Sequence, residues 1–98
     1  MILTTTDSIE GKTITEYKGI VTGVAINDKK LAMGFSVSKY YKAIQDSIDD
    51  VKENAFQSLL TNAKKMQANA VVGIKIDIEM TTSNYAMVSV TGTAVVVQ

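Results

Sequence analysis

The chain has 98 residues, with ten lysines and ten acidic residues, so its formal net charge at pH 7 is zero. This length suits one domain, residues 1–98, with a small core that would gain from further burial in an oligomer. The lack of arginine and of a basic excess argues against nucleic-acid binding. Cysteine and histidine are also absent, which removes the thiolate nucleophile, the usual neutral-pH base and the ligands that soft metals prefer.

Those absences, and the lack of any catalytic motif, predict a protein without enzymatic activity. No stretch approaches the roughly 20 apolar residues of a membrane span, and the first residues do not form a signal-peptide pattern. We therefore expect a cytoplasmic protein that has no membrane partner.

The first third of the chain has the features of β-structure. Residues 1–12 predict a short edge strand followed by a turn at Glu10 and Gly11. Residues 13–26 are β-branched and partly alternating, and they predict the first main strand. Gly19 and Gly23 fall on one face of that strand, where missing side chains permit a bend or the close approach of another backbone.

After a loop with apolar anchors over residues 27–37, residues 38–67 predict one long helix. Its apolar residues recur at steps of three or four, and they are Tyr41, Ile44, Ile48, Val51, Ala55, Leu59, Ala63 and Met66. Such a helix is about 40 Å long, whereas a compact domain of this size is about 30 Å across. One end should overhang, and we expect a neighbouring subunit rather than a kink to cover it.

The last third predicts a β-hairpin. Residues 70–80 alternate, with Val72, Ile74, Ile76, Ile78 and Met80 expected toward the core and Lys75, Asp77 and Glu79 away from it. After a polar turn at 81–84, residues 85–97 are uncharged and apolar on both faces. A strand of this kind is an aggregation hazard on an exposed edge, so we expect it in the centre of the sheet or in a subunit interface.

Four segments resemble the YbjQ-like family, catalogued as a "putative heavy-metal-binding domain". They are residues 11–23, 53–56, 70–77 and 87–94, which read GKTITEYKGIVTG, ENAF, AVVGIKID and MVSVTGTA. The resemblance covers nearly the whole chain. It implies an α+β subunit of β-α-β-β order and dodecin-like topology, with one long helix on an antiparallel sheet and the last strand central. It also implies a ring-forming oligomer, usually a pentamer.

The chain departs from the family pattern at three places. Family members commonly carry an acidic residue where this chain has Val24, and another where it has Lys75. They also have a Gly-rich loop before the last part of the helix, which is missing here because the region between Val24 and Asp50 is shortened.

The candidate ligand-binding residues are few. Glu16, Asp77 and Glu79 offer carboxylate oxygens, which suit a divalent metal ion such as Mg²⁺, Ca²⁺ or Mn²⁺ better than a soft heavy metal. A solvated charged face explains the same acids without a metal. Tyr17 and Tyr85, together with Tyr40 and Tyr41, are candidates for an interface or for stacking on a flat ligand.

Two functional hypotheses lead, and an unrecognised enzyme that uses Glu16 and Asp77 is a third alternative. The first is a homo-oligomeric ring that binds a metal ion or small molecule at its subunit interfaces. The second is a dodecin-like protein that binds or stores a flavin-type small molecule.

Overall fold

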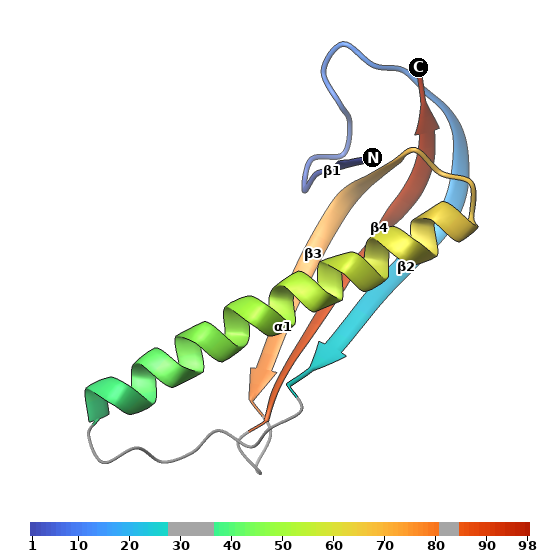
Figure 1. Cartoon of the computed structure of the whole chain (residues 1–98). Helices are drawn as coiled ribbons and strands as arrows, with labels where there is room; N and C mark the ends of the chain where they lie inside the picture. The colour runs from blue at the N-terminus through green and yellow to red at the C-terminus, as the bar shows by residue number, and fades with distance from the viewer. Residues whose placement is uncertain (28–36, 81–84) are drawn as a thin grey trace.

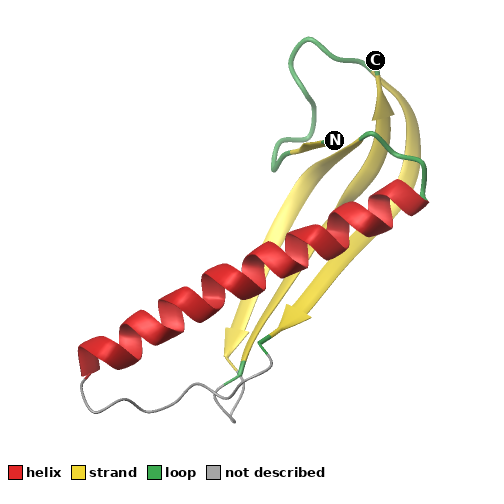
Figure 2. Ribbon diagram, in the orientation of Figure 1, coloured by secondary structure: helices red, strands yellow, loops and turns green. Residues whose placement is uncertain are grey.

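The computed structural model describes residues 1–27, 37–80 and 85–98. The expected loop with apolar anchors and the turn at 81–84 therefore lie largely or wholly outside the described residues. The elements are β1 (Ile2–Leu3), β2 (Ile14–Ile26), α1 (Val37–Lys65), β3 (Ala70–Met80) and β4 (Ala86–Val97). Figure 1 shows α1 lying diagonally across one face of the sheet, and Figure 2 shows the same two layers by type of structure. We call this the helix face and the opposite one the outer face.

The predicted α+β architecture is confirmed. The strand order is β1-β3-β4-β2, and β4 pairs antiparallel with both of its neighbours, so the last strand is central as expected. One correction is needed, because the sheet is mixed rather than wholly antiparallel. The two-residue β1 pairs parallel with β3, placing Ile2 opposite Ala70 and Leu3 opposite Val71.

The two glycines of β2 have the two roles expected of them. Gly19 has a φ of +124° and lies at a β-bulge that follows Tyr17. Gly23 lies directly under the helix, where a Cβ atom would stand 2.5 Å from Leu59 N and 2.9 Å from Leu59 Cα. Only a residue without a side chain allows the α1 backbone to come this close to β2.

The main core lies between α1 and the two strands that it covers, β2 and β4. Among the helix side chains that the structure describes, the buried ones are Val51, Ala55, Leu59 and Ala63, each no more than 2% exposed. They pack against Val21, Val71, Ile74, Val88, Val90 and Ala94. In the part of the helix whose side chains are described, residues 45, 46 and 48–65, the first buried position is Val51, and Figure 1 shows the first turns of the helix extending beyond the sheet. The expected overhang is therefore present, without an evident kink.

A second, smaller core lies on the outer face near the end of β4. Ala70, Val72, Val95 and Val97 are buried there, with Ile9 and Ile14 packed against them. The N-terminal arm, residues 1–10, reaches this face by passing around the edge of β3. Gly73 N donates to Thr6 O at 2.7 Å and Ile74 N donates to Thr4 O at 3.1 Å, so the arm is held by backbone hydrogen bonds.

The predicted faces of β3 are wrong in two respects. The register shifts between Val72 and Lys75, where Gly73 has a φ of +62°, and this bulge turns Val72 to the outer core. Beyond the bulge, Ile76, Ile78 and Met80 share the helix face with Val90, Val88 and Ala86 but remain 40%, 47% and 45% exposed. The reason is that α1 packs over β2 and β4, so that no described helix or strand covers this part of β3.

Candidate functional site

The acidic residues of β3 lie in a row on the outer face. Asp77 and Glu79 are exposed, and Lys75 shares their face. Across the sheet, β4 places Thr91 and Ser89 opposite Lys75 and Asp77, and β2 places Thr22 and Val24 beyond them. The outer face therefore runs from charged side chains on β3, through hydroxyls on β4, to mostly apolar side chains on β2.

Glu16 lies far from this row. Its partner in β4 is Val96, whereas the partner of Asp77 is Ser89, and seven residues of strand correspond to about 23 Å. Glu16 Oε1 instead accepts a hydrogen bond from Lys18 Nζ at 2.9 Å. Within residues 1–27, 37–80 and 85–98, no three Asp, Glu, His or Cys side chains are grouped to hold a metal ion.

The donor set decides which metals fit. A chain without cysteine or histidine offers only oxygen ligands, and such ligands select hard cations rather than soft heavy metals. Within one chain the three predicted carboxylates do not converge. A site that uses all of them needs residues from more than one subunit.

The two tyrosines of the described part of the chain are also separate. Tyr17 is 71% exposed and pairs with Val95, whereas Tyr85 is half-buried and directly precedes β4 at its other end. They do not form an aromatic pair in one chain. The side chains of Tyr40 and Tyr41 lie outside the described residues.

Two exposed apolar surfaces were missed as candidate sites by the sequence analysis. The outer stripe consists of Ile20, Val24 and Ile26 on β2, which are 78%, 49% and 50% exposed. The β3 strip consists of Ile76, Ile78 and Met80 on the helix face. Both surfaces lie on strands that were correctly predicted, but alternation alone does not reveal which face of a strand stays uncovered.

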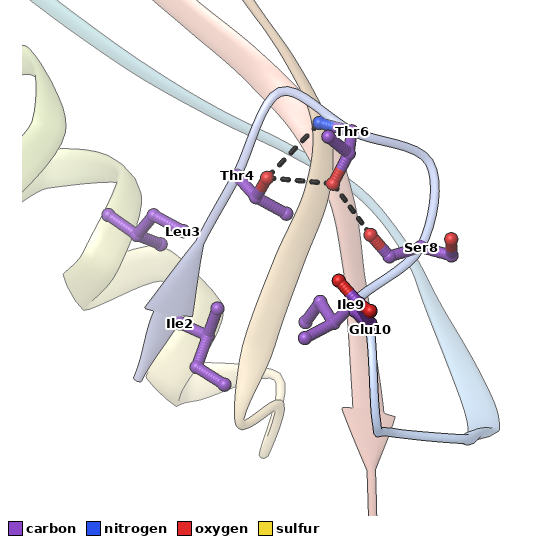
Figure 3. Close-up of a pocket in the computed structure, with 7 residues that line it drawn as sticks. All are labelled: Ile2, Leu3, Thr4, Thr6, Ser8, Ile9 and Glu10. Carbon is purple, nitrogen blue, oxygen red and sulfur yellow. Dashed lines mark hydrogen bonds between the residues drawn. The ribbon is translucent and has the colours of Figure 1, made fainter.

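A hollow of about 670 Å³ lies under the N-terminal arm. Figure 3 shows its lining residues, which are Ile2, Leu3, Thr4, Thr6, Ser8, Ile9 and Glu10. The threonine hydroxyls there are already paired: Thr4 Oγ1 and Thr6 Oγ1 are 2.8 Å apart, and Thr6 Oγ1 donates to Ser8 O at 2.6 Å. This pairing holds the arm in its bend and leaves Glu10 as the only charged group of the lining.

Comparison with known proteins places this architecture in a family. The model of the YbjQ-like family, described as "Putative heavy-metal-binding", matches residues 1–98. A "UPF0145 protein" of Clostridium kluyveri is 42% identical, and another of Acetivibrio thermocellus is 36% identical, each over the full length of both chains. A third, from Clostridium botulinum, is 40% identical over 97% of both chains. The chain belongs to the YbjQ-like family, to which these UPF0145 relatives correspond.

A solved structure supports the fold. A protein of unknown function from Pediococcus pentosaceus, assigned to the DUF74 family, superposes with a TM-score of 0.73. The match covers 100% of this chain and 98% of the other, at 20% sequence identity. At that identity the likeness establishes a shared fold.

Two of the three departures from the expected family pattern, Val24 and Lys75, fall on the outer face. Val24 lies opposite Ser89, which lies opposite Asp77, and Lys75 is the next residue of β3 on that face. Both positions at which family members commonly carry an acid are thus close to Asp77. A valine and a lysine there lower the negative charge available to a cation.

Among the described residues, no helix is both long and apolar enough to cross a membrane.

Proposed function

We propose that this protein is a non-enzymatic, cytoplasmic homo-oligomer, a pentameric ring that binds a divalent cation or a small ligand between its subunits. The observation that carries the proposal is the excess surface of the single chain. Its accessible area is 6430 Å², whereas a compact monomer of this mass exposes about 5,500 Å².

The shape supports the same conclusion. The radius of gyration is 16.1 Å, and the extents are 54 × 23 × 17 Å, whereas a compact chain of 98 residues has a radius of gyration of about 13 Å. A subunit of a stable assembly typically buries about 800 Å² against one partner. The excess of roughly 900 Å² over a compact monomer is about the area that one such contact buries, so the chain has surplus surface for contact with a neighbour.

The cation hypothesis rests on Asp77 and Glu79. They are exposed and lie on one face, and within the described ranges they belong to no group of three or more potential metal ligands. In a ring each carboxylate recurs around the symmetry axis, so oxygen ligands that are too few in one chain become numerous enough for a hard cation. The family description adds support for metal binding, while the donor set favours Mg²⁺, Ca²⁺ or Mn²⁺.

Native mass spectrometry tests both parts. We expect the purified protein to appear as a ring of five chains that takes up Mn²⁺, and the double variant Asp77→Asn/Glu79→Gln to form the ring with weaker uptake. Glu16→Gln is the matched control if the site lies on the outer face alone. A monomer contradicts the ring, and an assembled ring that takes up no Mn²⁺ or other tested cation contradicts the cation site.

The alternative, a dodecin-like protein that binds a flavin-type molecule, is favoured by one observation. Tyr17 exposes 71% of its surface and therefore has an aromatic face available for stacking. Titration with riboflavin would then quench flavin fluorescence, and Tyr17→Ala would abolish the quenching. Unchanged fluorescence at saturating protein eliminates this alternative.

A further inference from the structure

We propose that neighbouring subunits associate head to tail, with the outer stripe of one copy covering the β3 strip of the next. This inference rests on the proposed function, because it specifies the surfaces that join the ring. The occupant of both apolar surfaces is a second copy of this chain.

The β3 strip continues the apolar core of the helix face but lacks a layer of described residues that covers it. Ile76 lies opposite Val90 and Ile78 lies opposite Val88 on the same face of the sheet, yet both valines are 0% exposed while the isoleucines are 40% and 47% exposed. The helix that seals the valines lies over β4 and β2. The space above β3, beside the chain's own helix, is the part of the helix face that the described residues do not fill.

The outer stripe supplies a complementary surface. Ile20 and Val24 point away from α1, and Ile20 is the most exposed large apolar residue of the described chain at 78%. The stripe from Ile20 to Ile26 is about 20 Å long, and the strip from Ile76 to Met80 is about 13 Å long. Two sheet faces pack about 10 Å apart when apolar side chains fill the gap, so the stripe can cover the whole strip.

The positions of the two surfaces determine the type of assembly. The outer stripe lies on β2, at one edge of the main sheet, and the β3 strip lies across β4 on the opposite side and on the opposite face. A contact between them leaves a free stripe on one copy and a free strip on the other. Such a head-to-tail contact generates rings when its rotation closes.

The charges agree with this arrangement. Lys75, Asp77 and Glu79 alternate with the strip residues and therefore face away from it. Covering the strip buries none of them. By contrast, a symmetric contact between two outer faces would bring Asp77 and Glu79 of both copies toward one interface, with like charges adjacent.

Cysteine cross-linking tests the contact directly, because the natural chain has no cysteine. In the double variant Val24→Cys/Ile78→Cys, each interface holds one engineered thiol from each copy. After oxidation we expect a ladder of covalent dimers and larger species on a denaturing gel. Each single variant should remain monomeric on the same gel, since a head-to-tail contact does not bring identical positions together.

The double variant Val24→Cys/Asp77→Cys is the matched control. Position 77 lies between the strip residues but on the opposite face, so its thiol should remain uncross-linked. Covalent dimers from Val24→Cys alone would show a symmetric contact of outer faces and overturn the proposal. Equal ladders from both double variants would overturn it as well.

Native mass spectrometry of the same samples before oxidation tests the proposed ring separately from the proposed contact. Rings that form without the expected cross-link refute the contact between the outer stripe and the β3 strip and leave the proposed ring intact. Monomers from the natural chain refute both. Rings together with the ladder support both, whichever ligand the ring binds.

Discussion

The helix face of the sheet is divided into two halves that differ in burial although their strands are directly paired. Val88 and Val90 on β4 are fully buried, whereas their partners Ile78 and Ile76 on β3 are 47% and 40% exposed. The residues are of similar type and lie side by side. The difference arises from the position of α1. Because Gly23 has no side chain, α1 can lie close to β2, and it therefore lies away from β3. Burial on a sheet face is therefore set by where the helix docks, and not by the apolar pattern of each strand.

The largest expected effect comes from disrupting the contact between α1 and β2, which lies in the half of the helix face that α1 covers. In Gly23→Val the new Cβ would lie 2.5 Å from Leu59 N, so the helix backbone must move as a unit. We expect loss of the cooperative urea transition followed by circular dichroism. The control Thr22→Val introduces the same side chain at the exposed neighbouring position and should retain the transition. A native-like transition in Gly23→Val would show that the helix does not depend on this contact.

A smaller loss of stability is expected when the half of the helix face under α1 keeps its backbone geometry but loses side-chain packing. Leu59 is fully buried, so Leu59→Ala should lower the free energy of unfolding by about 3 kcal/mol. Leu60→Ala, at the half-buried neighbouring position, should lower it by about 1 kcal/mol. Chemical denaturation of both variants measures the difference. Equal losses would mean that the two leucines share one environment.

The uncovered half should respond to protein concentration as well as to truncation. Ile78→Ala removes a side chain that is half exposed in one chain, so we expect about 1 kcal/mol at high dilution. The loss should increase with protein concentration, because the natural chain gains stability from assembly that the variant lacks. Unfolding measured at several concentrations tests this, with Lys75→Ala on the opposite face as the control. A concentration-independent loss would place the strip outside any interface.

The smallest effect is expected away from both halves. Glu16 and Lys18 form a pair whose side chains are 57% and 20% exposed, and partly exposed pairs contribute little. Glu16→Gln should therefore change the free energy of unfolding by no more than about 0.5 kcal/mol. Lys18→Gln removes the same pair from the other side and should give a similar value. A loss above 2 kcal/mol in both would indicate a structural role for this pair.

The strands, the helix and the central place of β4 could be predicted because their causes are local or compositional. Alternation marks β2 and β3, the period of the apolar residues marks α1, and the uncharged β4 requires protection on both edges. Gly23 was also informative, since a missing side chain on a strand face signals the approach of a backbone.

The candidate site could not be predicted because it depends on long-range placement. Glu16 was predicted with Asp77 and Glu79 as a candidate metal ligand, but the pairing of Glu16 and of Asp77 with β4 fixes them seven residues apart along that strand. The faces of β3 depend on the bulge at Gly73, where one residue changes the side to which Val72 points. Alternation does not report a bulge, and nothing in β3 itself reports which strands the helix will cover.

The central position of β4 also imposes an order on synthesis. β2 and β3 leave the ribosome before the strand that joins them exists, and each then presents unpaired backbone and apolar side chains. A partial chain without β4 therefore lacks the main sheet, because β2 and β3 are paired only through β4 and β3 is otherwise paired only with the two-residue β1. The nascent chain is most vulnerable to proteolysis and mispairing until its twelve-residue final strand is complete, and its folding is then a single late event.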